Sequence, residues 1–152
     1  MLDIEAIRRT LPHRYPFLMV DRILEQEDGR VVGLKNVTID EPFFQGHFPQ
    51  PLGAIMPGVL ILESMAQTAA FLVPPSEPDG KRAGYLAGVD KARFRRLVVP
   101  GDQLRLEATL VRNRHGVLQA DVTASVDGET AASARLSLAI AEAGAETPEG
   151  AA

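Results

Sequence analysis

The sequence contains no cysteine, and this absence removes several classes of chemistry at once. There can be no disulfide framework, no thiolate nucleophile and no thiolate metal site. Long apolar runs are missing as well, since no stretch reaches the roughly 18 uninterrupted apolar residues that a membrane helix needs. Residues 1–17 mix charged and apolar side chains, which does not fit a secretory signal peptide. We therefore expect a cytoplasmic protein without membrane insertion.

The sequence also lacks an excess of positive charge. With 16 Lys and Arg against 20 Asp and Glu, the net charge of -4 argues against general nucleic-acid binding but permits a local basic patch. The chain has 152 residues, 45% hydrophobic and 24% charged, which suits a globular domain. We expect a single domain over residues 1–141. The remainder, 142–152, is rich in Ala, Gly and Glu and is expected to be disordered.

Local patterns predict a short first helix, a long central helix and several strands. Asp3 and Pro12 are the expected start and stop signals of the first helix. Pro57 suits the start of the long helix, which we expect from about Gly58 to Val73. The expected strands are residues 17–27, 30–39, 83–94, 103–113, 117–126 and 130–141.

The long helix is nearly apolar all round, and a helix of that composition is buried. Among five or six strands, the arrangement that buries it is an antiparallel sheet wrapped around it, an α+β fold. Glu63 is the one charged side chain of this helix, and Gln67 lies one turn further on the same stripe. A carboxylate in such surroundings is costly unless it is paired, neutralised or facing a cavity. An exposed edge of the helix is the open alternative.

A loop histidine precedes this helix. His47, in the segment GHFP, is by itself more often structural than catalytic. Together with Glu63 and the free N–H groups expected at Gly58 and Val59, it supplies a base, an acid and an oxyanion site. Those are the parts needed to remove a proton beside a carbonyl and to expel a hydroxyl.

Several long motifs resemble one enzyme family in the same order. They are LPHRYPFLMVDRI (11–23), NVTIDEPFF (36–44), FFQGHFP (43–49), IMPGVLILESMAQ (55–67) and YLAGVDKARFRRLVVPGDQL (85–104). They are similar to the (3R)-hydroxyacyl-acyl carrier protein dehydratases of type II fatty acid synthesis, over roughly residues 4–140. The resemblance implies a hot-dog fold. It also implies a homodimer with two active sites at the interface, commonly assembled further as a trimer of dimers.

The resemblance assigns roles to three residues. His47 matches the catalytic histidine, which removes a C2 proton from a β-hydroxyacyl thioester. Glu63 matches the catalytic glutamate, which belongs to the other protomer and helps the C3 hydroxyl leave as water. Gly58 matches the residue whose N–H binds the thioester carbonyl. The resemblance implies no metal or redox cofactor, and it implies a substrate that is carried on the phosphopantetheine of acyl carrier protein.

Further candidates follow from their positions in these motifs. Tyr85 is either a substrate-tunnel residue or an ordinary core aromatic, and Gln67 is a second candidate for the tunnel. We expect His13 to make a structural hydrogen bond and His115 to lie in a solvent-exposed turn.

A basic run stands out in this acidic chain. Its members are Lys91, Arg93, Arg95 and Arg96. The run is either a dock for acyl carrier protein or a sheet edge protected by charge. On a regular strand, Lys91, Arg93 and Arg95 would share a face.

Two departures from the family pattern keep alternatives open. The loop HFPQPLGAIMPG is two residues longer than in the family and has no arginine, and Leu97 stands where proline is expected. If His47 and Glu63 act across protomers, their spacing in one chain does not set the distance between them in the active site. Lengthening a loop by two residues also costs little free energy. The alternatives are a thioesterase of the same fold and a catalytically silent subunit, the latter favoured by the longer loop.

Overall fold

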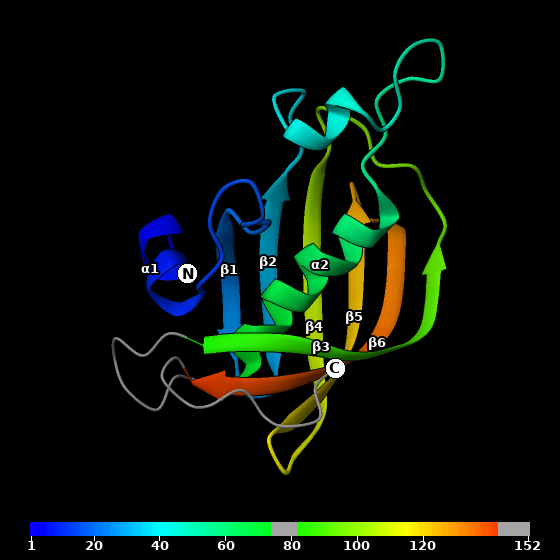
Figure 1. The fold of residues 1–152 in the computed structure, drawn as a ribbon. Helices are drawn as coiled ribbons and strands as arrows, with labels where there is room; N and C mark the ends of the chain where they lie inside the picture. Colours follow the sequence, from blue (N-terminus) through cyan, green and yellow to red (C-terminus); the bar gives the residue numbers. More distant parts are fainter. Residues whose placement is uncertain (74–81, 143–152) are drawn as a thin grey trace.

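In the computed structural model, which describes residues 1–73 and 82–142, six strands form one antiparallel sheet around a long helix (Figure 1). The strand order is β1-β2-β4-β5-β6-β3. The bounds are β1 (Arg22–Glu27), β2 (Arg30–Asn36), β3 (Arg82–Phe94), β4 (Gln103–Arg114), β5 (Val117–Val126) and β6 (Glu129–Glu142). The tail expected over 142–152 lies outside the described residues except for Glu142.

Over the described residues, the structure contains the two predicted α-helices and two short 3-10 turns that the sequence did not predict. They are α1 (Ile4–Thr10), α2 (Gly58–Ala69) and the 3-10 turns η1 (Pro42–Gln45) and η2 (Ala70–Leu72). The Asp3 carboxylate accepts a hydrogen bond of 2.9 Å from the Ala6 N–H, so Asp3 caps α1 as expected. The long helix ends as an α-helix at Ala69 and tightens into η2, so its last turn differs from the expected regular helix.

The core fills the space between α2 and the concave side of the curved sheet. From α2, Ile61, Met65 and Ala69 are almost fully buried. The same apolar cluster contains alternate residues of three strands: Leu104, Leu106, Ala108, Leu118, Ala120, Val122, Leu136 and Leu138. Alternation of this kind places one face of each strand against the helix. The prediction of an α+β hot-dog fold, with a sheet wrapped around a buried helix, is confirmed.

The segment before β1 differs from its prediction. A strand was expected to begin at Phe17, but β1 begins at Arg22. The reason is that the backbone of this segment bonds to a helix side chain instead of a neighbouring strand. The Met19 N–H donates to Gln67 Oε1 at 2.8 Å, and Gln67 Nε2 donates to the Phe17 carbonyl at 2.7 Å. These bonds dock residues 17–19 onto α2.

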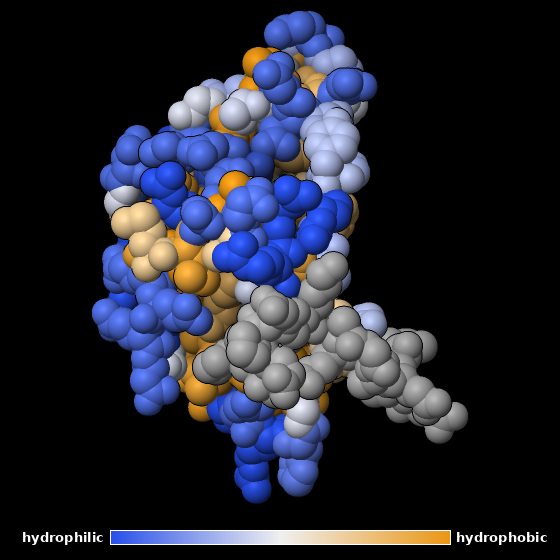
Figure 2. Space-filling view, turned by 90° about the vertical axis from the view of Figure 1, so that its left-hand side faces the viewer, coloured by the Kyte–Doolittle hydropathy of each residue, from blue (hydrophilic) through white to orange (hydrophobic). Residues whose placement is uncertain are grey.

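The two edge strands of the sheet, β1 and β3, have different neighbours. Edge strand β1 is bridged by Leu2, whose N–H and C=O both bond to Ile23, and α1 packs on this side. The face that carries α1 is mostly hydrophilic, with a smaller area of apolar atoms (Figure 2). At the other edge, β3 pairs only with β6 among the described residues. None of the helices in the described ranges is long and apolar enough to cross a membrane.

Candidate active site

His47 lies at the start of the loop that precedes α2, and Ile55 at the end of that loop holds it. The His47 C=O accepts from the Ile55 N–H at 3.1 Å, and its ring atom Nδ1 lies 2.7 Å from the Ile55 carbonyl. These two bonds close the base of the loop, so the intervening residues bulge outward, and Leu52 near the tip is 70% exposed. The outward bulge of this loop therefore does not interrupt the contacts that hold His47.

The same contact determines the tautomer of His47. A carbonyl oxygen can only accept, so Nδ1 must carry the proton that it shares with Ile55. Nε2 of the neutral ring is then an unprotonated acceptor. The Phe48 ring stacks on the imidazole, with 3.9 Å between ring centroids, and restricts its rotation. His47 thus has the form required of a general base.

A cavity of about 310 Å³ opens beside this ring. It is lined by His47, Phe48, Ile55, Met56, Gly58, Ile61, Phe94, Arg96, Leu97 and Val98. Apart from the imidazole and the Arg96 guanidinium, the lining side chains are apolar. The unexpected Leu97 is thus part of the cavity wall.

The N-terminus of α2 reaches this cavity through Gly58. The N–H groups of Leu60 and Ile61 both donate to the Pro57 carbonyl, whereas within the described chain no acceptor is recorded for those of Gly58 and Val59. Free N–H groups at a helix start favour negative charge. A Cβ on Gly58 would lie 2.9 Å from the Phe94 ring, so glycine permits this close approach. Gly58 therefore provides an unpaired N–H donor and also forms part of the cavity wall.

Glu63 lies elsewhere on the helix. Its side chain is 20% exposed, and its Oε1 accepts a 2.7 Å hydrogen bond from Gln67 Nε2. The same oxygen lies 3.4 Å from His13 Nε2. The carboxylate is thus largely buried and paired, and the alternative of an exposed helix edge is wrong.

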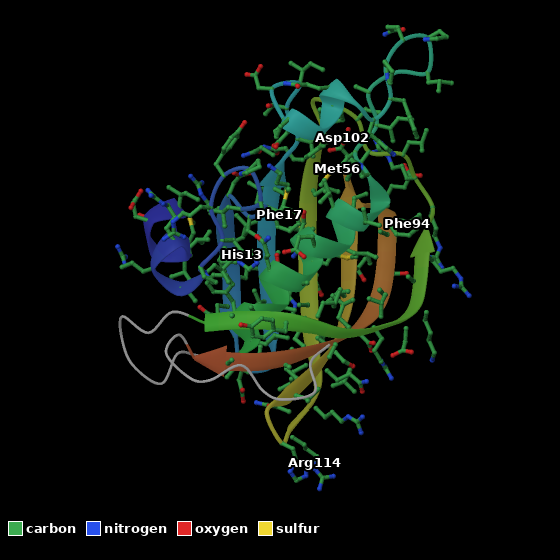
Figure 3. The ribbon with its side chains drawn as sticks, viewed as in Figure 1. His13, Phe17, Met56, Phe94, Asp102 and Arg114 are labelled. Carbon is green, nitrogen blue, oxygen red and sulfur yellow. The ribbon has the colours of Figure 1, made fainter. Side chains whose placement is uncertain are left out.

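A single chain does not bring Glu63 to the His47 cavity. Glu63 is absent from the cavity lining, and its recorded contacts are with Gln67 and His13. Figure 3 shows His13 beside α2 on the β1 side and Phe94 on the opposite side of the helix. The two predicted catalytic side chains therefore face different surroundings within one protomer.

The two candidates for the substrate tunnel differ in their surroundings. Gln67 is 2% exposed, and its amide bonds to the backbone of Phe17 and Met19 as well as to Glu63. All these partners belong to its own chain. Tyr85 lies on edge strand β3, is 41% exposed and does not line the His47 cavity. Its partial exposure does not fit an ordinary core aromatic of one chain.

The basic run is less regular than the sequence suggests. The pairing of β3 with β6 is bulged between Asp90 and Arg93, and Lys91 has a φ of 53°. The strand ends at Phe94, so the alternation that would align Lys91, Arg93 and Arg95 is interrupted. Arg93 and Arg95 are exposed on either side of Phe94.

Arg96 differs from the rest of the run because its charge is paired. Its guanidinium bonds to Asp102 at 2.8 Å and lies 3.2 Å from Glu129. Burial acts to raise the pKa of Asp102, but the hydrogen bonds from Arg96 and the Val99 N–H outweigh it and lower that pKa. Arg96 is thus a structural part of the cavity wall. Within residues 1–73 and 82–142, no group of three or more His, Asp and Glu side chains could hold a metal ion.

Sequence reasoning missed the environment of Glu63. His13 was expected to make a structural hydrogen bond, but it lies against the candidate catalytic carboxylate. The sequence shows only that His13 belongs to the motif LPHRYPF, and this motif does not reveal which residues His13 contacts. The role of the Ile55 carbonyl in orienting His47 was missed as well, because a backbone group has no signature in sequence.

Comparison with known proteins identifies the family. The model of a protein family described as "FabA-like domain" matches residues 11–135. A relative from Oceanobacillus iheyensis, named 3-hydroxyacyl-(acyl-carrier-protein) dehydratase FabZ, is 49% identical over 141 residues, covering 92% of this chain and 99% of that protein. A relative of the same name from Exiguobacterium sibiricum is 52% identical over 141 residues, with the same two coverages.

Solved structures with low sequence identity share the fold. The dehydratase heterocomplex ApeI:P from Xenorhabdus doucetiae aligns with a TM-score of 0.71 at 19% identity, covering 88% of this chain and 90% of that chain. A hypothetical thioesterase with coenzyme A from Streptococcus pneumoniae aligns at 0.60 and 16% identity, with 79% and 84% covered. At such identities the likeness concerns the fold alone. With a family match over most of its length and relatives near 50% identity, the chain belongs to the FabA-like family.

Proposed function

We propose that this protein dehydrates (3R)-hydroxyacyl groups on acyl carrier protein to trans-2-enoyl groups. The observation that carries the proposal is the tautomer of His47, whose Nδ1 is committed to the Ile55 carbonyl beside an apolar cavity. Membership of the FabA-like family and the names of its relatives support the same reaction.

The proposed reaction consists of proton transfers and one bond cleavage. His47 Nε2 takes a proton from C2 of the thioester, and the electron pair is delocalised onto the thioester oxygen. The Gly58 N–H, at the positive end of α2, stabilises the charge on that oxygen. The C3–O bond then breaks, its electron pair leaves with the hydroxyl oxygen, and the carboxyl group of the partner subunit's Glu63 gives that oxygen a proton to form water. The proton taken up by His47 replaces the one that Glu63 has lost, which closes the cycle. The products are the enoyl thioester and water, and this chemistry requires no metal or redox cofactor.

A homodimer is part of the proposal because Glu63 and the His47 cavity are separated within one chain. Edge strand β3 offers a surface for a second copy. It is 13 residues long, and its apolar residues Tyr85, Leu86 and Val89 are 39–47% exposed. A long edge with exposed apolar side chains is suited to pairing with another chain. Tyr85 would then lie at the interface, near the acyl chain that the family's tunnel accommodates.

Acyl carrier protein is the proposed substrate carrier, and its docking surface includes Arg93 and Arg95. Both side chains are exposed and adjoin Phe94, which lines the cavity. A phosphopantetheine arm delivered at this point would have a short path to His47. Lys91 adds positive charge nearby, whereas the charge of Arg96 is already paired.

The first test is turnover of a 3-hydroxybutyryl/crotonyl pair on acyl carrier protein by wild type, His47→Gln and Glu63→Gln. Each variant should lose at least about 100-fold in kcat. Glu5→Gln, which changes an exposed carboxylate on α1, should leave kcat unchanged. Wild type without turnover at several chain lengths would support a silent subunit, and release of free thiol would support a thioesterase.

Mixing the two inactive variants tests the shared site. In a heterodimer of the His47→Gln and Glu63→Gln chains, one of the two sites combines an intact His47 with an intact Glu63. With random assortment half of the dimers are mixed, so about a quarter of the wild-type activity should return. A site contained within one chain would show no recovery.

A further inference from the structure

The carboxylate of Glu63 is contacted through one oxygen only. Gln67 Nε2 donates to Oε1 at 2.7 Å, and His13 Nε2 lies 3.4 Å from the same atom. Among the described residues no contact of Oε2 is recorded. The chain therefore distinguishes two chemically equivalent oxygens, anchoring one and leaving the other available.

Both anchoring side chains are themselves held in place. The Arg14 guanidinium donates to the carbonyls of Leu11 and His13 at 2.9 and 2.6 Å, which fixes the turn that carries the imidazole. Gln67 is fixed by its bonds to Phe17 and Met19. Residues 13–19 are thus tied down at both ends, and the His13 ring is kept beside α2.

The Nε2 atom of the His13 ring lies 3.4 Å from Glu63 Oε1, so it is the ring nitrogen on the side of the carboxylate. Its Nδ1 is buried and has no hydrogen-bond partner in the described chain. A proton on Nδ1 would bury an unsatisfied N–H, so of the two neutral tautomers the one with its proton on Nε2 is favoured. This is the opposite tautomer to that of His47, whose Nδ1 carries the proton. His13 is therefore arranged as a donor through Nε2, whereas His47 is arranged as a base.

We propose that His13 is a positioning residue for the catalytic carboxylate. With Gln67 it holds Oε1 of Glu63, so that Oε2 alone is directed at the substrate hydroxyl in the partner's site. The 3.4 Å separation is longer than a formed hydrogen bond, so the proposal requires it to shorten when substrate is bound. This inference rests on the proposed dehydratase function and adds to it a residue that orients the acid.

The test compares His13→Leu, which removes the donor, with His13→Gln, whose amide nitrogen can replace Nε2. His13→Leu should lower kcat roughly 10- to 100-fold, as expected for a misplaced catalytic group, with KM on carrier-bound substrate within about twofold. His13→Gln should recover most of kcat. His13→Asn, whose amide is too short to reach Oε1, should behave like the leucine variant. His115→Asn, in an exposed turn, is the matched control and should resemble wild type.

A double-mutant cycle separates positioning from a general structural role. In a Glu63→Gln background, His13→Leu should cause no further loss of kcat, because the carboxylate it orients is gone. Equal kcat for the leucine and glutamine variants, wild-type kcat for His13→Leu, or an additive loss in the cycle would each overturn the proposal. If wild type itself fails to turn over, the proposed function fails instead, so the two failures are distinguishable.

Discussion

Replacing Gln67 with leucine tests whether the amide anchors both the N-terminal segment and Glu63. Leucine has nearly the same volume, so the substitution removes hydrogen bonds without opening a large cavity. It leaves the buried Met19 N–H and the Phe17 carbonyl without their partners at 2.8 and 2.7 Å. A buried backbone group left unpaired costs about 1–3 kcal/mol.

The expected loss of unfolding free energy is about 2–3 kcal/mol, because the Phe17 carbonyl is nearer the surface and is partly rehydrated. For a chain of this size each kcal/mol lowers Tm by roughly 2–4 °C, so Tm should fall by roughly 4–12 °C. Glu63 loses its 2.7 Å donor at the same time, so kcat should fall even at temperatures where the variant is folded.

The assay is thermal unfolding at one fixed protein concentration, followed by turnover well below Tm. Gln119→Leu is the matched control, because that amide makes a single long contact of 3.4 Å with Ser137. It should change stability by less than about 0.5 kcal/mol. A Gln67→Leu protein that melts within about 2 °C of wild type, or no lower than the control, would refute the anchoring role.

Two further predictions concern charge. Reversing Arg93 and Arg95 to glutamate should raise KM for carrier-bound substrate about tenfold or more while sparing a small thioester, because it repels an acidic carrier. The matched control reverses Arg112 and Arg114 at the end of β4, where Figure 3 shows Arg114 far from Phe94, and equal effects would defeat the docking proposal. Asp102→Asn should cost about 1.5–3 kcal/mol at pH 7, the usual contribution of hydrogen bonds to a charged group. Because the pKa of Asp102 is lowered in the folded protein, this stabilisation is present above the pKa of the unfolded chain and is lost as the pH falls. That difference, measured by urea unfolding, should persist from pH 7 to 5 and shrink below about pH 4; a difference independent of pH would contradict it.

The surroundings of Phe17 and Glu63 show that local sequence patterns do not predict contacts between residues remote in sequence. Residues 17–20 are apolar and were expected to extend β1, but the backbone of Phe17 and Met19 bonds to Gln67, which lies 48 positions beyond Met19. Strand propensity describes local backbone preference and carries no information on a side chain that replaces the neighbouring strand. The pairing of Glu63 with His13, 50 positions earlier in the chain, was beyond reach for the same reason.

The sequence by itself determined the features that depend on local chemistry. The apolar composition of residues 58–69 required a buried helix, and the turn dipeptides Asp127-Gly128 and His115-Gly116 lie in the left-handed region that tight hairpins need. The motifs around His47 and Gly58 also indicated the chemistry. Only the tertiary structure decided the proton on His47, the anchoring of Glu63 and its separation from the cavity. The two properties of Glu63 depend on atoms remote in sequence, which meet only once the sheet has closed around α2. The proton on His47 depends on the conformation of its loop, which places the Ile55 carbonyl against the ring.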